Sequence, residues 1–156
     1  MPSRRETIRM SATEVDAYLR QRSRVILVTI GADGMPHPVP MNYGLDETGR
    51  FILTSFRKSR KVANLRRDPR ATLLVESGET YAELKAVIAW CRAEVIEDVD
   101  EVARLMPLVR AETSLSSSIS EGMNEQVRDS LAKRAVLRFT PNRYASWDHA
   151  RLGAYY

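Results

Sequence analysis

A hairpin near the amino end restricts the folds open to this chain more than any other segment. Residues 24–30 (R-V-I-L-V-T-I) are β-branched and apolar on both faces, and the Asp33-Gly34 pair that follows is typical of a tight turn. A strand that is apolar on both faces needs two covers, which predicts a barrel interior on one side and a helix or a second subunit on the other. Residues 35–43 should return as the antiparallel partner strand.

Three prolines, Pro36, Pro38 and Pro40, alternate along this partner strand. Proline has no backbone N–H to donate to a β-ladder, so it is tolerated where a strand has no neighbour on that side. The shared side of the three prolines is therefore expected to be a sheet edge, a bulge or a wall that faces a ligand.

The rest of the chain alternates short strand patterns with a few helical ones. Ser11-Ala12-Thr13-Glu14 is a capping box, which predicts a helix that ends near residue 22. Further strands are expected at residues 50–55, 71–76, 84–97 (long and bent), 135–139 and 143–147, the last two joined by a turn at Thr140-Pro141-Asn142. Further helices are expected just after Ser59, at 100–113 and at 120–132, with the serine-rich residues 115–118 as a mobile connection and residues 115–120 as a candidate lid.

Short strands at hairpin spacing predict an antiparallel barrel rather than a parallel α/β sheet. The fold class is therefore mainly β (α+β), with flanking helices. A length of 156 residues suits a single domain over residues 1–156, with residues 1–10 as a flexible arm.

The segment from residue 57 to residue 70 concentrates positive charge where a strand pattern gives way to a helix. It carries seven basic residues and one acid, in a chain of net charge +4. Ser59 is expected to cap the helix, and cations near a helix amino end are electrostatically misplaced unless an anion binds there. We therefore predict an anion site at Arg60 and Lys61, while Arg66, Arg67 and Arg70 near the carboxyl end are expected to be structural.

Several other classes of site are disfavoured. Cys91 is the only cysteine, which excludes an internal disulfide and a multi-cysteine metal site and suggests a buried small hydrophobe. His37 and His149 are expected to be bystanders, with haem ligation by either left open, and no metal site is expected. No apolar run approaches the roughly 18 residues of a membrane helix, and no signal peptide is evident. We expect a cytoplasmic protein with no membrane partner.

The order of several motifs resembles a known family. These motifs are Asp33-Gly34 with Pro36, Thr54-Ser55, Ser59-Arg60-Lys61, Asn64-Leu65, Asp68-Pro69-Arg70-Ala71, and Ser146-Trp147-Asp148-His149 with Arg151-Leu152. Together they resemble the split β-barrel flavin-binding family typified by pyridoxamine 5′-phosphate oxidase, from about residue 11 to residue 152. The similarity is greatest to its actinobacterial branch of flavin- and deazaflavin-dependent oxidoreductases.

The resemblance implies a six-stranded antiparallel split β-barrel of the FMN-binding type, in a homodimer with two cofactors at the interface. It implies that Arg60 and Lys61 hold the cofactor phosphate beside Ser59, and that Thr54 and Ser55 bind the phosphate or ribityl chain. It also implies that Pro38, Val39, Pro40, Met41 and Asn42 lie along the ring, and that Trp147 and Arg151 approach from the C-terminal strand, within one subunit or across the dimer.

Two features depart from the family pattern. Residues 147–151 (W-D-H-A-R) do not reproduce the order of arginine and histidine that grips the substrate phosphate in pyridoxamine phosphate oxidase itself, so that substrate is not expected. Cys91 stands where relatives often have glycine, and its side chain would narrow the pocket or pack the dimer.

These observations give one principal hypothesis and two alternatives. The principal one is an oxidoreductase that transfers a hydride between coenzyme F(420), or FMN as a close second, and a small organic substrate, with no identified catalytic side chain. The first alternative is a non-catalytic flavin- or haem-binding protein on the same barrel. The second is a nucleic-acid-binding protein that uses residues 57–70, which the absence of an RNA- or DNA-reading motif disfavours.

Overall fold

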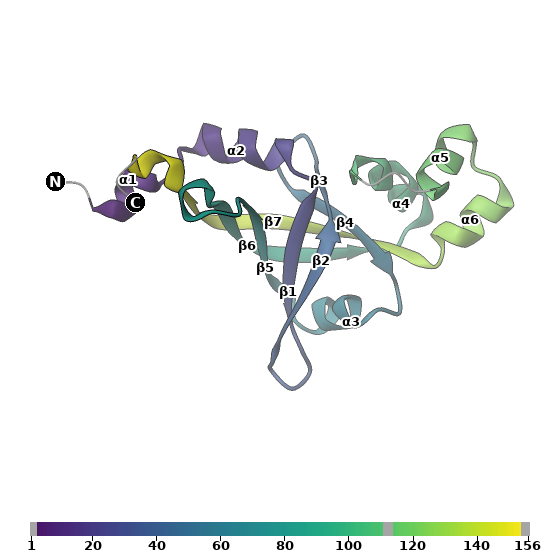
Figure 1. Cartoon of the computed structure of the whole chain (residues 1–156). Helices are drawn as coiled ribbons and strands as arrows, with labels where there is room; N and C mark the ends of the chain where they lie inside the picture. Colours follow the sequence, from purple (N-terminus) through teal and green to yellow (C-terminus); the bar gives the residue numbers. More distant parts are fainter. Residues whose placement is uncertain (1–2, 111–113, 154–156) are drawn as a thin grey trace.

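The computed structural model of this chain describes residues 3–110 and 114–153. Within them, a curled antiparallel sheet forms a split barrel that carries helices on its outside (Figure 1). The strands are β1 (Arg24–Ile30), β2 (Pro36–Asn42), β3 (Gly44–Leu45), β4 (Phe51–Phe56), β5 (Arg70–Ser77), β6 (Lys85–Ile96) and β7 (Arg134–Asp148). The helices are α1 (Arg4–Ile8), α2 (Ala12–Gln21), α3 (Arg60–Arg67), α4 (Val99–Leu105), α5 (Ser114–Glu121) and α6 (Glu125–Leu131), with short 3₁₀ helices η1 (Tyr81–Glu83), η2 (Met106–Leu108) and η3 (His149–Leu152).

The strand order is β2-β1-β5-β6-β7-β4-β3, and every neighbouring pair is antiparallel. The predicted fold class is confirmed, with seven strands in place of six because the two-residue β3 pairs with the start of β4. β2 and β4, which lie near the two ends of this order, approach one another and so complete the curl.

The predicted hairpin is confirmed along its whole length. β1 and β2 pair from Arg24 opposite Asn42 to Ile30 opposite Pro36. β2 is the first strand of the sheet, so the prolines lie on a sheet edge, which was one of the three predicted settings.

The N-terminal region is helical on both sides of residue 10. The capping box of α2 is present, with the Ser11 hydroxyl accepting from the Glu14 N–H and the Glu14 carboxylate accepting from the Ser11 N–H. The segment expected to be a flexible arm contains α1, which begins with a second capping box at Ser3 and Glu6. No helix among the described residues is long and apolar enough to cross a membrane.

The prediction of two closing strands was wrong. The structure has one 15-residue strand, β7, which continues through Pro141. The partner strand β4 ends its ladder where Phe51 pairs with Phe139, so from Thr140 onward β7 has only β6 beside it. A proline is tolerated there because one side of the strand has no ladder to lose, and the register shift between Trp90 and Cys91 lies opposite it.

The segment between β6 and β7 differs from the sequence prediction. Instead of a helix at 100–113, α4 ends at Leu105 and continues as η2, while residues 111–113 lie outside the described residues. The serine-rich residues 115–118 belong to α5, so the prediction of a connecting loop was wrong. The second helix of this region, α6, begins later than predicted because the side chain of Asn124 caps it.

Two apolar clusters hold these layers together, and β4 contributes to both. Phe51 and Leu53 face the barrel interior, while Ile52 faces a second cluster beneath α4 and α6. Successive residues of a strand point to opposite faces, so Ser55 lies on the interior face of β4 and Thr54 on the other. This alternation decides which side chains can meet at the end of β4.

Candidate functional site

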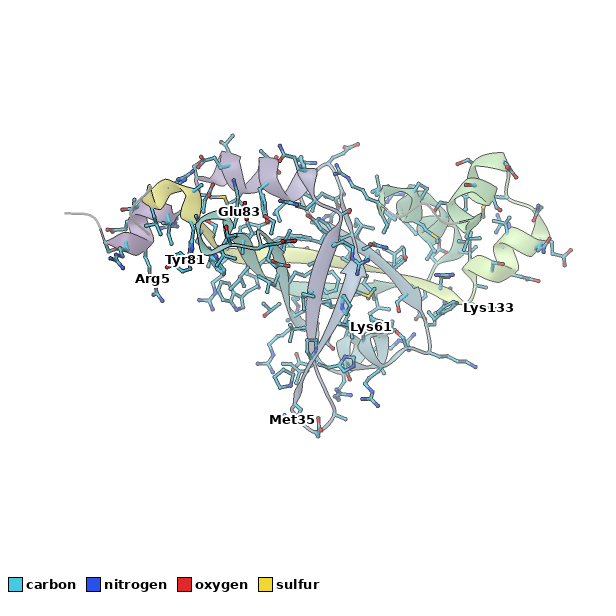
Figure 2. The ribbon with its side chains drawn as sticks, viewed as in Figure 1. Arg5, Met35, Lys61, Tyr81, Glu83 and Lys133 are labelled. Atoms are coloured by element: carbon cyan, nitrogen blue, oxygen red, sulfur yellow. The ribbon has the colours of Figure 1, made fainter. Side chains whose placement is uncertain are left out.

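The start of α3 lies directly after β4 and brings together three predicted site residues. The ammonium of Lys61 donates to the Ser55 hydroxyl at 3.2 Å, and the Ser55 and Ser59 hydroxyl oxygens lie 2.9 Å apart. Figure 2 shows Lys61 above α3 and beside the strands, whereas Met35 marks the exposed tip of the hairpin. These contacts form a Ser55–Ser59–Lys61 cluster at the strand-to-helix junction.

Ser59 does not cap the helix, which corrects the sequence prediction. It occupies the N-cap position of α3 with an extended backbone, but its side chain makes no cap hydrogen bond and turns to Ser55 instead. The first backbone bond to its carbonyl comes from Ala63, so the preceding N–H groups of the first turn have no helical partner. The amino end of α3 is consequently an uncapped set of donors at the positive end of a helix dipole.

The positive charge at the junction of β4 and α3 has no acidic residue beside it in the helix. The first turn of α3 contains no acidic residue. Lys61 is partly buried, and burial lowers the pKa of its ammonium below the usual lysine value, because a charge taken out of water is disfavoured. A cation held at the wrong end of a helix dipole and partly dehydrated is stabilised by an anion, and a phosphate is the anion that also accepts several N–H and O–H bonds.

Most of the basic run has a structural role instead. Arg57 donates to the backbone carbonyls of Arg134 and Glu97, and Arg66 pairs with the Glu97 carboxylate at 2.5 Å. Arg67 donates to the Ile30 carbonyl and Arg70 pairs with Asp68, whose pKa is lowered to about 2 by hydrogen bonds from Arg70. Within residues 3–110 and 114–153, the side chains of Lys58 and Arg60 make no hydrogen bond or ion pair.

Arg60 and Lys61 face different surroundings. Adjacent helical residues are about 100° apart around the axis, so the two side chains diverge. Lys61 reaches Ser55, whereas Arg60 lines a cavity of about 590 Å³ between α3 and the β1–β2 hairpin, together with His37. That the two cations hold one phosphate stays a prediction.

The predicted ring wall on β2 is divided between two faces. Val39 and Met41 are partly buried and pack against the barrel core, while Pro38 and Pro40 are exposed on the outer face, and Asn42 ends the strand. Thr54 and Ser55 are divided in the same way on β4. Side chains of only one face at a time can line a bound ring, because strand residues alternate.

Trp147 and Arg151 lie far from Lys61 within one chain. Val136 pairs with Thr54, and Trp147 follows it by eleven residues along β7, which is about 35 Å at a strand rise of 3.3 Å per residue. Arg151 is bound to the Arg9 carbonyl and the Glu14 carboxylate, so it fastens η3 to the N-terminal segment. A single chain does not bring these two residues to the candidate site.

The outer face of the sheet is apolar and only half-covered. By register, one face unites side chains from β2, β1, β5, β6 and β7 that are exposed or partly buried: Pro38, Pro40, Ile26, Val28, Leu74, Ile88, Trp90, Ala145 and Trp147. We call this set the outer apolar face. The guanidinium of Arg143 lies 4.1 Å above the Trp90 ring at its margin.

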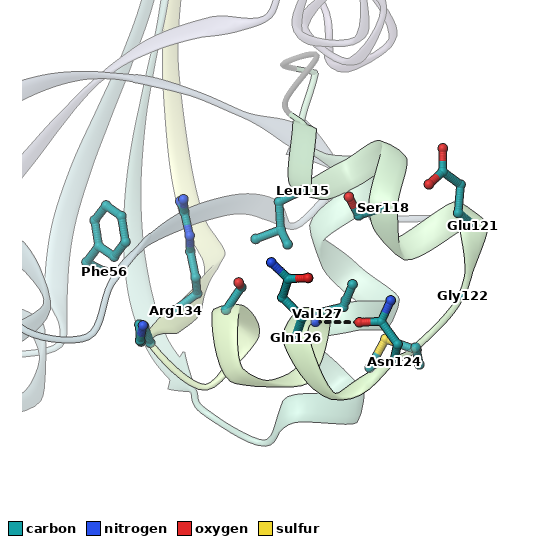
Figure 3. Close-up of a pocket in the computed structure, with 12 residues that line it drawn as sticks. Phe56, Leu115, Ser118, Glu121, Gly122, Asn124, Gln126, Val127 and Arg134 are labelled. Atoms are coloured by element: carbon teal, nitrogen blue, oxygen red, sulfur yellow. Dashed lines mark hydrogen bonds between the residues drawn. The ribbon is translucent and has the colours of Figure 1, made fainter.

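A larger cavity, of about 710 Å³, lies between the end of β4 and helices α5 and α6 (Figure 3). The Arg134 guanidinium lies 4.2 Å above the Phe56 ring on one side, and Leu115 and Gln126 line the other. This cavity opens on the face of β4 opposite Ser55. Sequence reasoning missed it because its walls come from separate segments, and no local pattern marks Phe56 or Arg134.

Cys91 and His149 lie outside the Ser55–Ser59–Lys61 cluster and have other surroundings. Cys91 points into the barrel core, where burial raises the pKa of its thiol to about 12, so it packs the interior and not the outer face. His149 Nδ1 lies 2.9 Å from the Tyr81 carbonyl, and the His149 and Tyr81 rings are in contact, tilted by 55° to one another. The described residues hold no group of three or more metal-ligating side chains.

Comparison with known proteins agrees with this architecture. A family model described as pyridoxamine 5′-phosphate oxidase matches residues 11–148. The chain belongs to the pyridoxamine 5′-phosphate oxidase family. A conserved hypothetical protein from Mycobacterium tuberculosis superimposes on this family member with a TM-score of 0.80 and 31% identity, over 99% of this chain and 95% of that chain.

Two more distant solved structures share the fold of the family. An FAD-binding protein from Mesorhizobium loti is similar with a TM-score of 0.65 and 19% identity, over 88% of this chain and 93% of that one. An F(420) reductase is similar with a TM-score of 0.58 and 16% identity, over 92% and 98%. At these identities the likeness concerns the fold alone.

The junction of β4 and α3 fits the anionic end of a cofactor. It offers unpaired backbone donors, two hydroxyl groups and the Lys61 ammonium, without an acid in the first turn. These are the groups that bind phosphate at helix amino ends in general. The groups at the start of α3 therefore match a phosphate in charge and in hydrogen bonding.

Proposed function

We propose that this member of the pyridoxamine 5′-phosphate oxidase family is an oxidoreductase that uses coenzyme F(420), or FMN as the close alternative. The reaction is hydride transfer between the cofactor and a small organic substrate. The observation that carries the proposal is the uncapped amino end of α3, where Ser55, Ser59 and Lys61 meet without an acidic neighbour. The preference for coenzyme F(420) rests on the sequence resemblance to the deazaflavin-dependent branch.

The residues have distinct parts in this proposal. Lys61, Ser55 and the first N–H groups of α3 hold the phosphate, and the free edge of β4 beside Thr54 offers backbone groups to the polar atoms of the cofactor. Strand β2, from Pro38 to Asn42, forms a wall for the ring. The cofactor, when bound, supplies the hydride chemistry, while the protein positions it and excludes water.

The proposed working unit is a homodimer joined through the outer apolar face. In the single chain that face leaves Pro38 exposed and Val28 and Trp90 partly buried, and a face of this kind is stabilised by a second apolar surface. The two-fold partner would also supply the route by which Trp147 and Arg151, remote from Lys61 in one chain, approach the cofactor of the other subunit.

A spectroscopic titration tests the proposal. Purified protein is titrated with FMN, coenzyme F(420) and haem in parallel, and each absorbance change is followed to saturation. Saturable binding of FMN or coenzyme F(420), followed by turnover with an added reductant or acceptor, supports the oxidoreductase. If neither FMN nor coenzyme F(420) binds, the proposal is wrong.

A non-catalytic binding protein is the second candidate. The observation that favours it is the composition of the Ser55–Ser59–Lys61 cluster, whose two hydroxyl groups and one ammonium can hold a phosphate. A chromophore that binds stoichiometrically but is not turned over with any reductant or acceptor would establish this alternative.

A further inference from the structure

The cavity of about 710 Å³ lies between the strand pair β4–β7 and the helices α5 and α6. Phe56 and Arg134 line it from the strands, and Leu115, Gln126 and Val127 line it from the helices (Figure 3). We call this space the helical cavity. Its volume is within the range of about 300 to 1,000 Å³ that is typical of small-molecule sites in proteins.

Phe56 and Arg134 form one wall of the helical cavity. They lie directly opposite each other in the β4–β7 ladder, and the Arg134 guanidinium carbon is 4.2 Å from the centre of the Phe56 ring. Phe56 is 56% exposed, so much of its surface is free to contact a ligand. A planar ring that packs here is stabilised by apolar burial and by stacking on aromatic and guanidinium groups.

The hydrogen-bond donors of Arg134 are available to a ligand. Within the parts of the chain that the structure describes, the Arg134 side chain makes no hydrogen bond or ion pair, and it contacts the Phe56 ring. A guanidinium carries five N–H donors in one plane, and it binds a carboxylate through two parallel hydrogen bonds. Arg134 is partly buried, which strengthens its attraction to an anion relative to that of a fully hydrated arginine.

The charges around the helical cavity favour an anion beside Arg134. Lys133 adds a second positive charge at the start of β7, and Glu121 is the one acid among the described lining residues. Figure 3 shows Glu121 on the far side of α5, with its carboxylate pointing away from Arg134. The side-chain oxygen of Asn124 is already used, because it accepts from the Val127 N–H and caps α6.

The helices supply apolar surface and an amide opposite Arg134. In Figure 3, Leu115 of α5 and Gln126 of α6 point into the space that Arg134 faces from β7. The Gln126 side chain has no hydrogen-bond partner among residues 3–110 and 114–153, so its amide can donate to a ligand oxygen. A ligand in the helical cavity therefore meets apolar groups along its body and hydrogen-bond donors at one end.

We infer that the helical cavity binds an aromatic carboxylate, with the carboxylate on Arg134 and the planar ring between Phe56 and Leu115. A neutral aromatic molecule would leave the guanidinium without an acceptor, and an aliphatic carboxylate would leave Phe56 uncovered. The inference is independent of the proposed function, because no lining residue belongs to the Ser55–Ser59–Lys61 cluster and the cavity opens on the other face of β4.

Three probes separate the contribution of the ring from that of the charge. Naphthoate has both features, naphthalenemethanol has the ring alone, and cyclohexanecarboxylate has the charge alone. Isothermal titration calorimetry of the full chain without added cofactor should show saturable binding of one naphthoate per chain, with each of the other probes at least about tenfold weaker. Equal affinity for the three probes, or no saturable binding of naphthoate, would overturn the inference.

Substitutions test the two wall residues. Arg134→Ala should weaken naphthoate binding by about tenfold or more, and Phe56→Leu by about three- to tenfold. Arg128→Ala is the matched control, because it removes the same charge from α6, where Arg128 pairs with Asp100 outside the cavity, and it should change the affinity by less than about twofold. Wild-type affinity in Arg134→Ala would overturn the inference.

The side-chain amide of Gln126 locates the probe without any change to the cavity. The chain has two glutamines, Gln21 and Gln126, so the amide signals of glutamine-labelled protein are assigned in an NMR spectrum with a Gln21→Ala variant. Naphthoate should shift the Gln126 signals and leave those of Gln21 unchanged. Gln126 signals that stay in place at saturation would overturn the inference even if the Arg134 variant does not fold.

Lys61→Ala distinguishes the helical cavity from the proposed cofactor site. This variant should bind naphthoate within about twofold of the wild type, because Lys61 reaches Ser55 on the other face of β4. Loss of naphthoate binding in Lys61→Ala would place the probe at the phosphate cluster and overturn the inference. Failure of FMN and coenzyme F(420) to bind would overturn the proposed function alone.

Discussion

Gly44 lies directly against the backbone of Leu108, so close that a Cβ atom at position 44 would come within 1.7 Å of the Leu108 carbonyl oxygen. Gly44 opens the short strand β3, and Leu108 ends η2 in the segment between β6 and β7. The contact is continued by the bond from the Arg110 N–H to the Tyr43 carbonyl at 3.3 Å. The barrel and the helical segment that covers β4 are therefore joined backbone to backbone at this point.

Gly44→Ala should destabilise the protein, because the obstacle is backbone and cannot rotate away. We expect a loss of about 3 kcal/mol in the free energy of unfolding, the upper end for overpacking. Gly49→Ala is the matched control: nothing lies within 4 Å of its Cβ position, and only the positive φ of 82° opposes alanine, at about 1 to 2 kcal/mol. Urea denaturation measures both, and a smaller loss for Gly44→Ala than for Gly49→Ala would contradict the close contact.

Arg57 and Lys58 are adjacent cations, and substituting each one tests which basic residues of the segment 57–70 are structural. Arg57 donates to the carbonyls of Arg134 and Glu97, so Arg57→Ala should lower the free energy of unfolding by about 2 kcal/mol. Lys58 has no side-chain partner among the described residues and is exposed, so Lys58→Ala should change it by less than about 0.5 kcal/mol. Equal effects in denaturant titrations would show that Arg57 is not structural.

Alkaline pH should weaken cofactor binding through Lys61. Burial lowers the pKa of its ammonium, so on raising the pH the charge is lost before that of an ordinary lysine. The affinity for FMN or coenzyme F(420) should be constant below this pKa and fall above it, because the phosphate then loses a charged donor. Lys61→Arg should remove the fall, since arginine stays protonated.

Lys61→Ala measures how much the Lys61 ammonium contributes to cofactor affinity. Lys61→Ala should weaken cofactor binding by about 10- to 150-fold, which corresponds to about 1.5 to 3 kcal/mol for a hydrogen bond to a charged group. Dissociation constants from pH 7 to pH 10 provide the measurement for all three proteins. An affinity that is independent of both substitutions would place the phosphate elsewhere.

The parts of the fold that the sequence predicted well are those specified by neighbouring residues. Ser11 and Glu14 are three residues apart, and their capping box starts α2 where expected. The Asp33-Gly34 turn likewise produced a hairpin in full register. Pro141 was misleading because its tolerance in β7 depends on where a different strand, β4, stops.

The candidate site shows the same limit. Lys61, Ser59 and Ser55 lie within seven residues of one another, and their junction could be predicted from strand and helix patterns alone. The cavity between α3 and the β1–β2 hairpin could not, because Arg60 and His37 line it together only through the return of β2 beside α3. Trp147 lies far from Lys61 because β7 is one unbroken strand. The sequence prediction divided this strand in two at Pro141 and therefore did not indicate the distance.

Cys91 should be unreactive in the folded protein. Burial raises the pKa of the thiol to about 12, so almost no thiolate exists at pH 8, and the side chain points into the barrel core. Labelling with a thiol-specific disulfide reagent at pH 8 should be slow in buffer and rapid in denaturant, where the pKa returns to about 8.5. Cys91→Ala controls for non-specific signal, and rapid native labelling would contradict the burial.

A charge placed on the outer apolar face tests the proposed homodimer. Val28 belongs to that face and lies opposite Pro38 on one neighbouring strand and Thr72 on the other. In a dimer, Val28→Glu would bury a carboxylate against an apolar surface without a partner, which is strongly unfavourable. Light scattering should show the mass falling from about twice the 17.7 kDa of the chain to that of one chain.

The same variant tests whether the cofactor site needs both subunits. If the partner completes the site, Val28→Glu should lose cofactor affinity together with the dimer, because the Val28 side chain lies on the sheet face opposite Thr29, the residue that binds Asn64 of α3. Ala17→Glu, on the exposed side of α2, adds the same charge to a helix that packs against the barrel-interior cluster, and it should keep both the dimer mass and the affinity. A monomeric Val28→Glu protein that still binds cofactor with wild-type affinity would show that one chain builds the whole site. A wild type that is already monomeric would refute the dimer itself.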